Sequence, residues 1–274
     1  NISDPLSKHL SSIKGRKLNE FYEHLSMEEG NKVTIKQLLS HRSGIADIFT
    51  DTEDEFLELL IQNTQKQYTP ATIIDLYFQL NTRKFSSSPS TNAWHYSDMN
   101  YVLLGLLLEH LEQKPLHEII RDELLAPLKM NDTYFEFYES PTADKPATQQ
   151  FVGNINFSQV NTSFDWAGGG LVSTHQDLAA FISALFNGKV LSPESLLKMM
   201  ETKATTTNES PYGLGLYKTI YAGEEFFGHY GFYGTYIGYS PKSNTTLSYC
   251  INQAQPDIHV YQFINQLVKL TMKE

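Results

Sequence analysis

The hydrophobic period of the chain changes from helical to alternating after Pro211, and this change limits the fold more than any other sequence feature. Four short alternating runs follow, at residues 212–221, 225–230, 233–239 and 245–252. Gly223, Gly231 and residues 241–244 separate the runs, so we predict four strands in an antiparallel meander. Residues 258–273 carry apolar side chains on one stripe, which predicts a helix that covers one face of this sheet.

The sequence before that point predicts a block of helices. Thr34 and Thr174 are expected N-caps, and Gly44 and Gly188 are expected to end the helices that begin there. Further helical patterns occur at residues 20–25, 54–62, 70–80, 115–125 and 193–202. A helical block, a strand block and a closing helix together indicate an α+β fold.

Size and composition agree with this fold class. A chain of 274 residues can bury a large core, and 41% hydrophobic and 19% charged residues are typical of a globular protein. We expect one domain over residues 1–274, with a helical lobe at about 20–204 and a sheet lobe at about 205–274.

Composition also argues against several functions. The formal charge of −10 and the lack of a basic run argue against nucleic-acid binding. No apolar stretch reaches the length of a membrane span. Cys250 is the single cysteine, which excludes an internal disulfide, and its strand-like surroundings predict a buried side chain. The chain starts with Asn1 instead of Met, so we expect it to be part of a longer gene product.

The stretch from Trp94 to Gly105 reads WHYSDMNYVLLG and places a polar trio before an apolar run. Ser97 or Asp98 can cap a helix there. The buried face of this helix is expected to carry Tyr101, Leu104, Leu108 and Leu111. Tyr96 would be held at the helix N-terminus, where backbone N–H groups favour a negative charge. This position suits a tyrosinate base, and the alternative is an ordinary capped helix with an aromatic staple.

Two further segments suggest roles near a site. Residues 132–164 are irregular, aromatic and too long for a plain connection, which is typical of binding or lid loops. Residues 168–170 are three glycines, which allow the backbone to pass close to another group. His41 is interpreted as a structural histidine bonded to nearby backbone.

The chain carries four stretches in order, VTIKQLLSHRSGI, YSDMNYVLLG, AGGGLVST and GHYGFYG. Together they resemble the serine β-lactamase and penicillin-binding-protein superfamily. The matching branch holds class C β-lactamases, D-alanyl-D-alanine peptidases, D-aminopeptidases and carboxylesterases. The resemblance covers nearly the whole chain. It implies a β-lactamase/transpeptidase-like fold, an acyl-enzyme mechanism without a cofactor, and an exported or periplasmic location.

The resemblance also implies roles for individual residues. Tyr96 takes the place of the general base, with a phenol pKa lowered by neighbouring positive charge. His229 takes the lysine position of the third motif, with Gly231 beside the substrate. The Phe232 N–H would donate to the oxyanion. Gly169 is expected to line the substrate site. Tyr96 and His229 should come from different lobes and face one cleft.

The nucleophile motif Ser-x-x-Lys is where the sequence departs from the family. The strings at 11–14 and 195–198 match it, but neither stands where the family has it. We expect the catalytic serine and lysine in a segment that precedes Asn1.

Two substitutions bear on the substrate. Asp98 replaces an asparagine whose amide donates to the substrate carbonyl, and a carboxylate can donate only when protonated. His229 and Tyr230 replace a lysine and a small hydroxyl residue. Both changes favour an esterase or peptidase over an efficient β-lactamase.

Three functions remain open at this point. The first is a serine hydrolase acting on an ester, a peptide or a β-lactam. The second is a non-catalytic relative that binds peptidoglycan-like peptides or a partner protein. The third is a metal-dependent hydrolase, but no two of the nine histidines show the His-x-x-x-His spacing of a metal site. We therefore predict no metal. The oligomeric state is left open.

Overall fold

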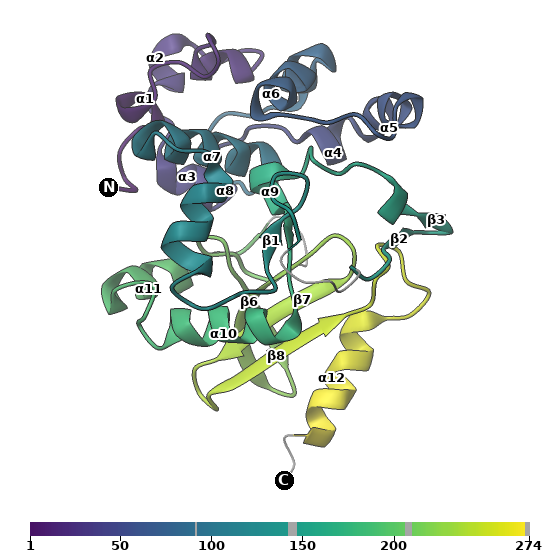
Figure 1. Cartoon of the computed structure of the whole chain (residues 1–274). Helices are drawn as coiled ribbons and strands as arrows, with labels where there is room; N and C mark the ends of the chain where they lie inside the picture. Colours follow the sequence, from purple (N-terminus) through teal and green to yellow (C-terminus); the bar gives the residue numbers. More distant parts are fainter. Residues whose placement is uncertain (91, 142–146, 206–209, 272–274) are drawn as a thin grey trace.

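A computed structural model shows most helices gathered in one part of the molecule, and an antiparallel sheet with a few helices beside it in the other (Figure 1). It describes residues 1–90, 92–141, 147–205 and 210–271. Most helices come before the sheet in the chain, which confirms the predicted α+β order. No helix in these ranges is long and apolar enough to cross a membrane.

Most helical elements follow the predicted patterns, but the helix that was expected to end at Gly44 already ends at Leu39. The α-helices in the described ranges are α1 (Leu6–His9), α2 (Met27–Gly30), α3 (Ile35–Leu39), α4 (Ile48–Asp51), α5 (Glu53–Gln62), α6 (Pro70–Gln79), α7 (Asp98–Glu112), α8 (Leu116–Ile120), α9 (Trp166–Gly169), α10 (His175–Phe186), α11 (Pro193–Met200) and α12 (Val260–Thr271). Short 3-10 or π turns are η1 (Leu18–Phe21), η2 (Thr82–Phe85), η3 (Arg121–Leu125) and η4 (Phe157–Gln159).

Local capping explains where two of these helices begin. Thr34 Oγ1 accepts the Gln37 N–H at 3.2 Å, and the Gln37 side chain accepts the Thr34 N–H at 2.9 Å. Thr174 Oγ1 accepts the Asp177 N–H at 3.1 Å at the start of α10. These contacts satisfy N–H groups that a helix start leaves without a partner. Both predicted caps are confirmed.

The strands are β1 (Tyr134–Phe135), β2 (Phe151–Val152), β3 (Ile155–Asn156), β4 (Leu171–Val172), β5 (Tyr217–Tyr221), β6 (Glu224–Tyr230), β7 (Thr235–Ser240) and β8 (Thr245–Cys250). The last four form one antiparallel sheet in the order β5-β6-β7-β8, which confirms the predicted meander. β1 pairs with β4, and β2 pairs with β3. Residues 142–146 of the long loop between β1 and β2 lie outside the described residues.

Helices cover both faces of the four-stranded sheet (Figure 1). Tyr236 of β7 packs with Ile264 of α12 on one face. Tyr239, three residues further along the same strand, packs with Ile182 and Leu185 of α10 on the other. Side chains of a strand alternate between its faces, so these contacts place the sheet between two helices. The predicted C-terminal helix is therefore confirmed as a cover of one face.

The buried face of α7 differs from the prediction. Leu108 and Leu111 are 41% and 52% exposed, whereas Leu103, Leu106 and Leu107 are buried. Helices α1, α3, α4, α8 and α9 all contact α7. Because these helices surround the first turns of α7, its buried surface is wider than a single stripe of side chains. The exposed side therefore includes the last two leucines of the predicted stripe.

Several smaller predictions are wrong. The first predicted strand begins at Tyr217 instead of Tyr212, because the backbone turns at Gly215, where φ is +75°. No single helix spans residues 20–25, because the 3-10 turn η1 ends at Phe21 and α2 begins only at Met27. Cys250 is exposed instead of buried, because it ends β8 at the edge of the described sheet.

Facing glycines in the centre of the sheet give a test of the packing. Gly228 of β6 lies opposite Gly238 of β7, and a Cβ at Gly228 would lie 1.9 Å from the Ile237 carbonyl oxygen. We expect Gly228→Ala to lower the free energy of unfolding by about 1–3 kcal/mol or more, because such overpacking must displace backbone. Denaturant unfolding measures this change.

Gly169→Ala is the matched control, because no atom lies within 4 Å of a Cβ built at Gly169. Its unfolding midpoint should stay close to that of the unaltered chain. Equal midpoints for Gly228→Ala and the unaltered chain would contradict the pairing of β6 with β7.

Candidate active site

Tyr96 lies two residues before α7 and is anchored through its neighbour Ser97. The Ser97 N–H donates to His41 Nδ1 at 3.1 Å, and Ser97 Oγ donates to the Ala46 carbonyl oxygen at 3.1 Å. Ser97 occupies the N-cap position, but its side chain does not cap α7. The predicted side-chain cap is therefore wrong, and a contact to the segment before α4 replaces it.

The His41 ring packs against the Tyr96 ring. It is fully buried and lies 4.2 Å from the Tyr96 ring, centroid to centroid. Nδ1 also lies 3.2 Å from Asn100 Nδ2, so this nitrogen is the acceptor and the ring proton is on Nε2. Burial holds the pKa of His41 well below its ordinary value. The interpretation of His41 as a structural histidine bonded to backbone is confirmed.

His229 reaches the same place from the sheet. It lies near the end of β6, and its ring centroid is 6.1 Å from that of Tyr96. Its Nδ1–H donates to the Tyr230 carbonyl oxygen at 2.6 Å, and its Nε2 accepts the Tyr212 hydroxyl at 3.1 Å. Both bonds fit a neutral ring, and burial lowers the pKa of His229. A charged His229 is thus disfavoured.

The phenol of Tyr96 is protonated in this environment. Burial is the main cause that raises its pKa, and the Asp98 carboxyl is the next. Tyr217, Tyr101 and Asp47 act in the same direction. The positive charge that the family resemblance implies beside this phenol does not occur among these groups.

Asp98 opens α7 and is held by its backbone and its side chain. Its N–H donates to Asp47 Oδ1 at 2.7 Å. A Cβ at Gly168 would lie 3.1 Å from both the Cβ and Cγ of Asp98, so the two segments touch. Burial, then the carboxyls of Asp47 and Asp165, raise the pKa of Asp98 well above its ordinary value.

The other predicted site residues lie at the ends of β6 and α9. The Gly231 N–H donates to the Thr235 carbonyl oxygen at 2.8 Å in the turn after β6. Phe232 follows in that turn, and its side chain is 71% exposed. Gly169 faces open space, whereas Gly168 contacts Asp98. The roles assigned to Gly231, Phe232 and Gly169 stay predictions.

The two Ser-x-x-Lys strings lie on the surface. Ser11 is exposed before the turn that includes Lys14, whose φ is +48°. Ser195 is exposed on α11, where Lys198 forms an ion pair with Glu194 at 2.7 Å. Neither string has the buried lysine that could activate a serine.

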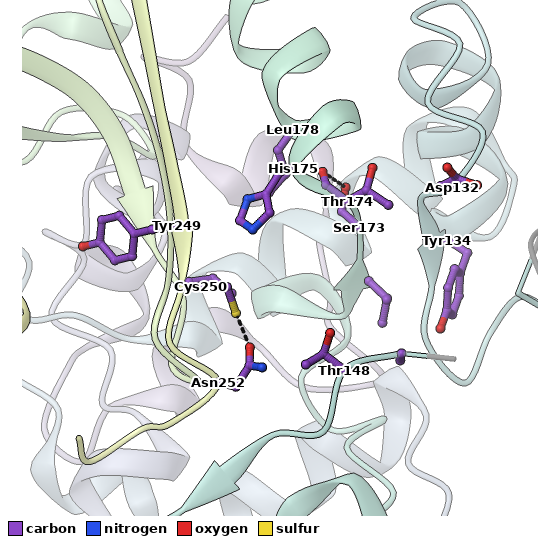
Figure 2. Close-up of a pocket in the computed structure, with 13 residues that line it drawn as sticks. Asp132, Tyr134, Thr148, Ser173, Thr174, His175, Leu178, Tyr249, Cys250 and Asn252 are labelled. Carbon is purple, nitrogen blue, oxygen red and sulfur yellow. Dashed lines mark hydrogen bonds between the residues drawn. The ribbon is translucent and has the colours of Figure 1, made fainter. Parts of the chain in front are cut away.

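A cavity of about 480 Å³ lies between β8, the start of α10 and the β1–β4 pair (Figure 2). Polar side chains such as Thr148, Ser173, His175 and Asn252 line it. Tyr96, Asp98 and His229 are not among its lining residues. Tyr96 and His229 therefore approach each other directly, and this cavity is not the cleft that was predicted between them.

Sequence reasoning missed two residues that shape the site. Asp47 accepts the Asp98 N–H and also caps α4, and its place before Phe49 and Thr50 was a usable N-cap signal. Tyr212 contacts His229 across the sheet edge, and no local pattern marks it. Within the described ranges no group of three His, Cys, Asp or Glu side chains could hold a metal ion.

Comparison with known proteins defines the class. The family model for beta-lactamase matches residues 1–269, so the chain belongs to the beta-lactamase family. The D-amino acid amidase from Ochrobactrum anthropi SV3 has a similar structure, with a TM-score of 0.79 and 22% identity. The match covers 100% of this chain and 78% of that one. This likeness confirms the β-lactamase/transpeptidase-like fold.

Two curated relatives are similar in sequence. The unguisins hydrolase of Aspergillus campestris is 24% identical over 80% of this chain and 43% of its own length. A putative penicillin-binding protein of Bacillus subtilis is 24% identical over 89% of this chain and 57% of its own length. The chain thus spans less than two thirds of either relative.

Tyr212→Phe tests the assigned ring proton of His229. The Tyr212 hydroxyl donates to Nε2 and thereby favours the neutral ring. Removing it should raise the pKa of His229 by up to about one pH unit. NMR titration of the histidine C–H signals in both forms measures the change. Tyr221→Phe is the control, since that hydroxyl contacts Tyr230 and Tyr249. A pKa of His229 that falls in Tyr212→Phe would contradict the assignment.

Proposed function

We propose that the chain is the main part of a serine hydrolase that acts through an acyl-enzyme. The observation that carries this proposal is the approach of Tyr96 and His229, whose rings lie 6.1 Å apart although they come from the helical part and the sheet. This approach joins the second and third motifs of the family at one place. Membership of the beta-lactamase family supports the same mechanism.

In the proposed reaction, a serine Oγ attacks the carbonyl carbon of the substrate. Tyr96 takes the serine proton as general base and then gives it to the leaving group. The Phe232 N–H donates to the oxyanion, with the N–H of the serine as the second donor. We place this serine and its lysine in a segment that precedes Asn1. The lysine supplies the positive charge that lowers the pKa of Tyr96.

The proposed substrates are esters or short peptides and amides that contain D-amino acids, ahead of β-lactams. His229 is neutral in the structure and offers no fixed charge to a β-lactam carboxylate. A structural neighbour is named a D-amino acid amidase, which agrees with an amide substrate.

A non-catalytic binding protein is the second candidate. The observation that favours it is the state of Tyr96, because burial raises its pKa and keeps the phenol protonated. A protonated phenol can hold a peptide through hydrogen bonds without accepting a proton. The two candidates differ in whether a covalent adduct forms.

Acylation distinguishes these candidates. We expect the 274-residue chain to form no adduct with a chromogenic ester, a nitrocefin-type β-lactam or a fluorescent penicillin. The longer gene product should acylate, and Tyr96→Phe should slow its acylation about 10²–10⁴-fold, because the general base is lost. Mass spectrometry of the intact protein measures the added acyl group.

Tyr261→Phe is the matched control, since Tyr261 is half-exposed on α12 and its hydroxyl donates to a backbone oxygen, that of Ile220. Its acylation rate should equal that of the unaltered protein. An adduct on the 274-residue chain would place the nucleophile inside it, and Ser11 would then be the first serine to replace. No adduct on the longer product would support the binding protein.

A further inference from the structure

We infer that Asp98 meets the substrate as a neutral carboxylic acid, and that its proton makes the hydrogen bond to the substrate carbonyl that an asparagine makes elsewhere in the family. This inference rests on the proposed function and adds a regulation by pH to it. A carboxylic acid has the shape of an amide but donates only while it holds its proton. Recognition of the substrate should therefore end when Asp98 ionises.

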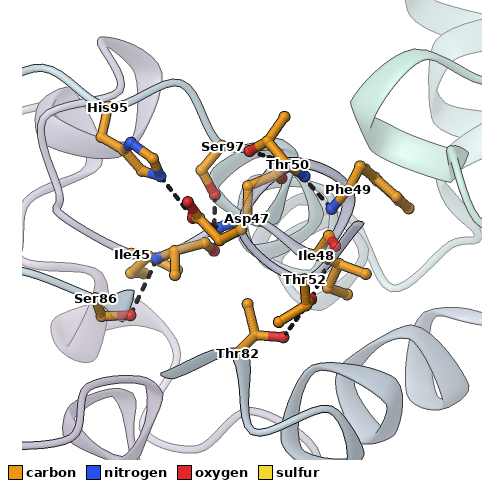
Figure 3. Close-up of polar contacts among 12 residues, drawn as sticks. Ile45, Asp47, Ile48, Phe49, Thr50, Thr52, Thr82, Ser86, His95 and Ser97 are labelled. Atoms are coloured by element: carbon orange, nitrogen blue, oxygen red, sulfur yellow. Dashed lines mark hydrogen bonds and ion pairs between the residues drawn. The ribbon is translucent and has the colours of Figure 1, made fainter. Parts of the chain in front are cut away.

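The first observation is the way in which Asp47 is held (Figure 3). Asp47 is 1% exposed, and its Oδ2 accepts the N–H groups of Phe49 and Thr50 at 3.0 and 3.1 Å. Its Oδ1 accepts the Asp98 N–H at 2.7 Å. Three N–H donors aimed at one carboxyl favour its charged form. Burial, partly offset by these bonds, raises the pKa of Asp47 to about 6, whereas the pKa of Asp98 is raised well above its ordinary value. Of these two neighbouring acids, Asp47 is thus the one that loses its proton first.

The second observation is the other side of Asp98. The backbone at Gly168 touches the Asp98 side chain and limits its access to water. Asp165 stands just before this backbone, and burial together with Glu136 raises its pKa to about 7. Asp98 therefore lies close to two acids, Asp47 directly before α4 and Asp165 directly before α9. Burial and both acids disfavour a charge on Asp98.

Among the residues that the structure describes, the other groups that act on Asp98 or Tyr96 do not supply a positive charge. Tyr96 acts on it as a hydrogen-bond partner and lowers its pKa, against the larger effects of burial. Tyr101, one turn along α7, is a neutral phenol whose pKa is raised to about 12. His41 and His229 flank Tyr96, and burial lowers the pKa of each ring.

His95 pairs with Asp51, the last residue of α4, at 2.7 Å. The hydrogen bond to Asp51 raises the pKa of His95. The positive charge of His95 is therefore compensated by the Asp51 carboxylate next to it.

A neutral Asp98 also helps the general base. The charge of an ionised Asp98 raises the pKa of Tyr96 and opposes the tyrosinate. When Asp98 keeps its proton, this opposition is removed. The same proton thus serves both substrate recognition and the ionisation of Tyr96. Asp98→Asn should reproduce both effects without a titrating group.

The 274-residue chain allows a test that does not need activity. A carboxyl whose pKa is raised in the folded state contributes stability below its unfolded pKa, and this contribution is lost as the pH rises through the folded pKa. The Tm of the unaltered chain should therefore fall as the pH rises from the ordinary carboxyl range through the raised pKa of Asp98. In Asp98→Asn this fall should be clearly smaller. The exposed Asp75→Asn is the control and should keep the full fall.

The second measurement uses the longer gene product, which is expected to acylate. Its kcat/KM should decrease at least about tenfold toward alkaline pH, and Asp98→Asn should keep its kcat/KM there. An equal fall in Tm for the unaltered chain and Asp98→Asn would mean that Asp98 is already ionised and would overturn the inference. A Tm difference with identical pH profiles of kcat/KM would overturn the role in recognition. Absence of turnover in every form would instead overturn the proposed function, while the Tm comparison still decides the protonation of Asp98.

Discussion

Two backbone N–H groups at the start of α7 determine where the candidate site lies. The Ser97 N–H donates to His41 and the Asp98 N–H donates to Asp47. The start of a helix leaves such donors without partners, and here both acceptors come from the connection between α3 and α4. Because α3 and α4 also pack against α7, this arrangement is fixed by the core. These bonds fix the backbone that directly follows Tyr96 and thereby the position of Tyr96 itself.

The same packing that positions the site also removes water from it, and this makes charge costly there. His41 and His229 are held neutral, and the pKa of Asp165 is raised to about 7. For a buried acid, keeping the proton costs less free energy than burying the charged carboxylate. Its proton is therefore lost only at a higher pH. The site is therefore rich in titratable groups and poor in charge. Reactions that begin with proton transfer suit such an environment.

The sequence predicted those features that depend on a few neighbouring residues. The caps at Thr34 and Thr174 and the alternation after Pro211 are local, and all three were predicted correctly. The motif resemblance, which orders segments along the chain, led to Tyr96 and His229 as neighbours. Contacts made across the fold could not be read in this way. The exposure of Leu108 depends on which helices surround α7, and the contact of Tyr212 with His229 depends on how the sheet edge meets the helices.

The helix start at α7 does not by itself make Tyr96 a base, although its position before a helix N-terminus suggested so. The N–H groups of Ser97 and Asp98 are already taken by His41 and Asp47. The charge that the helix N-terminus favours is thus that of Asp47. Burial is the largest cause that raises the pKa of Tyr96, and the Asp47 charge adds to it. A tyrosinate at this place needs a cation of its own. The proposed mechanism assigns that cation to the lysine beside the nucleophile, so that the serine and the means of activating its base enter the site together.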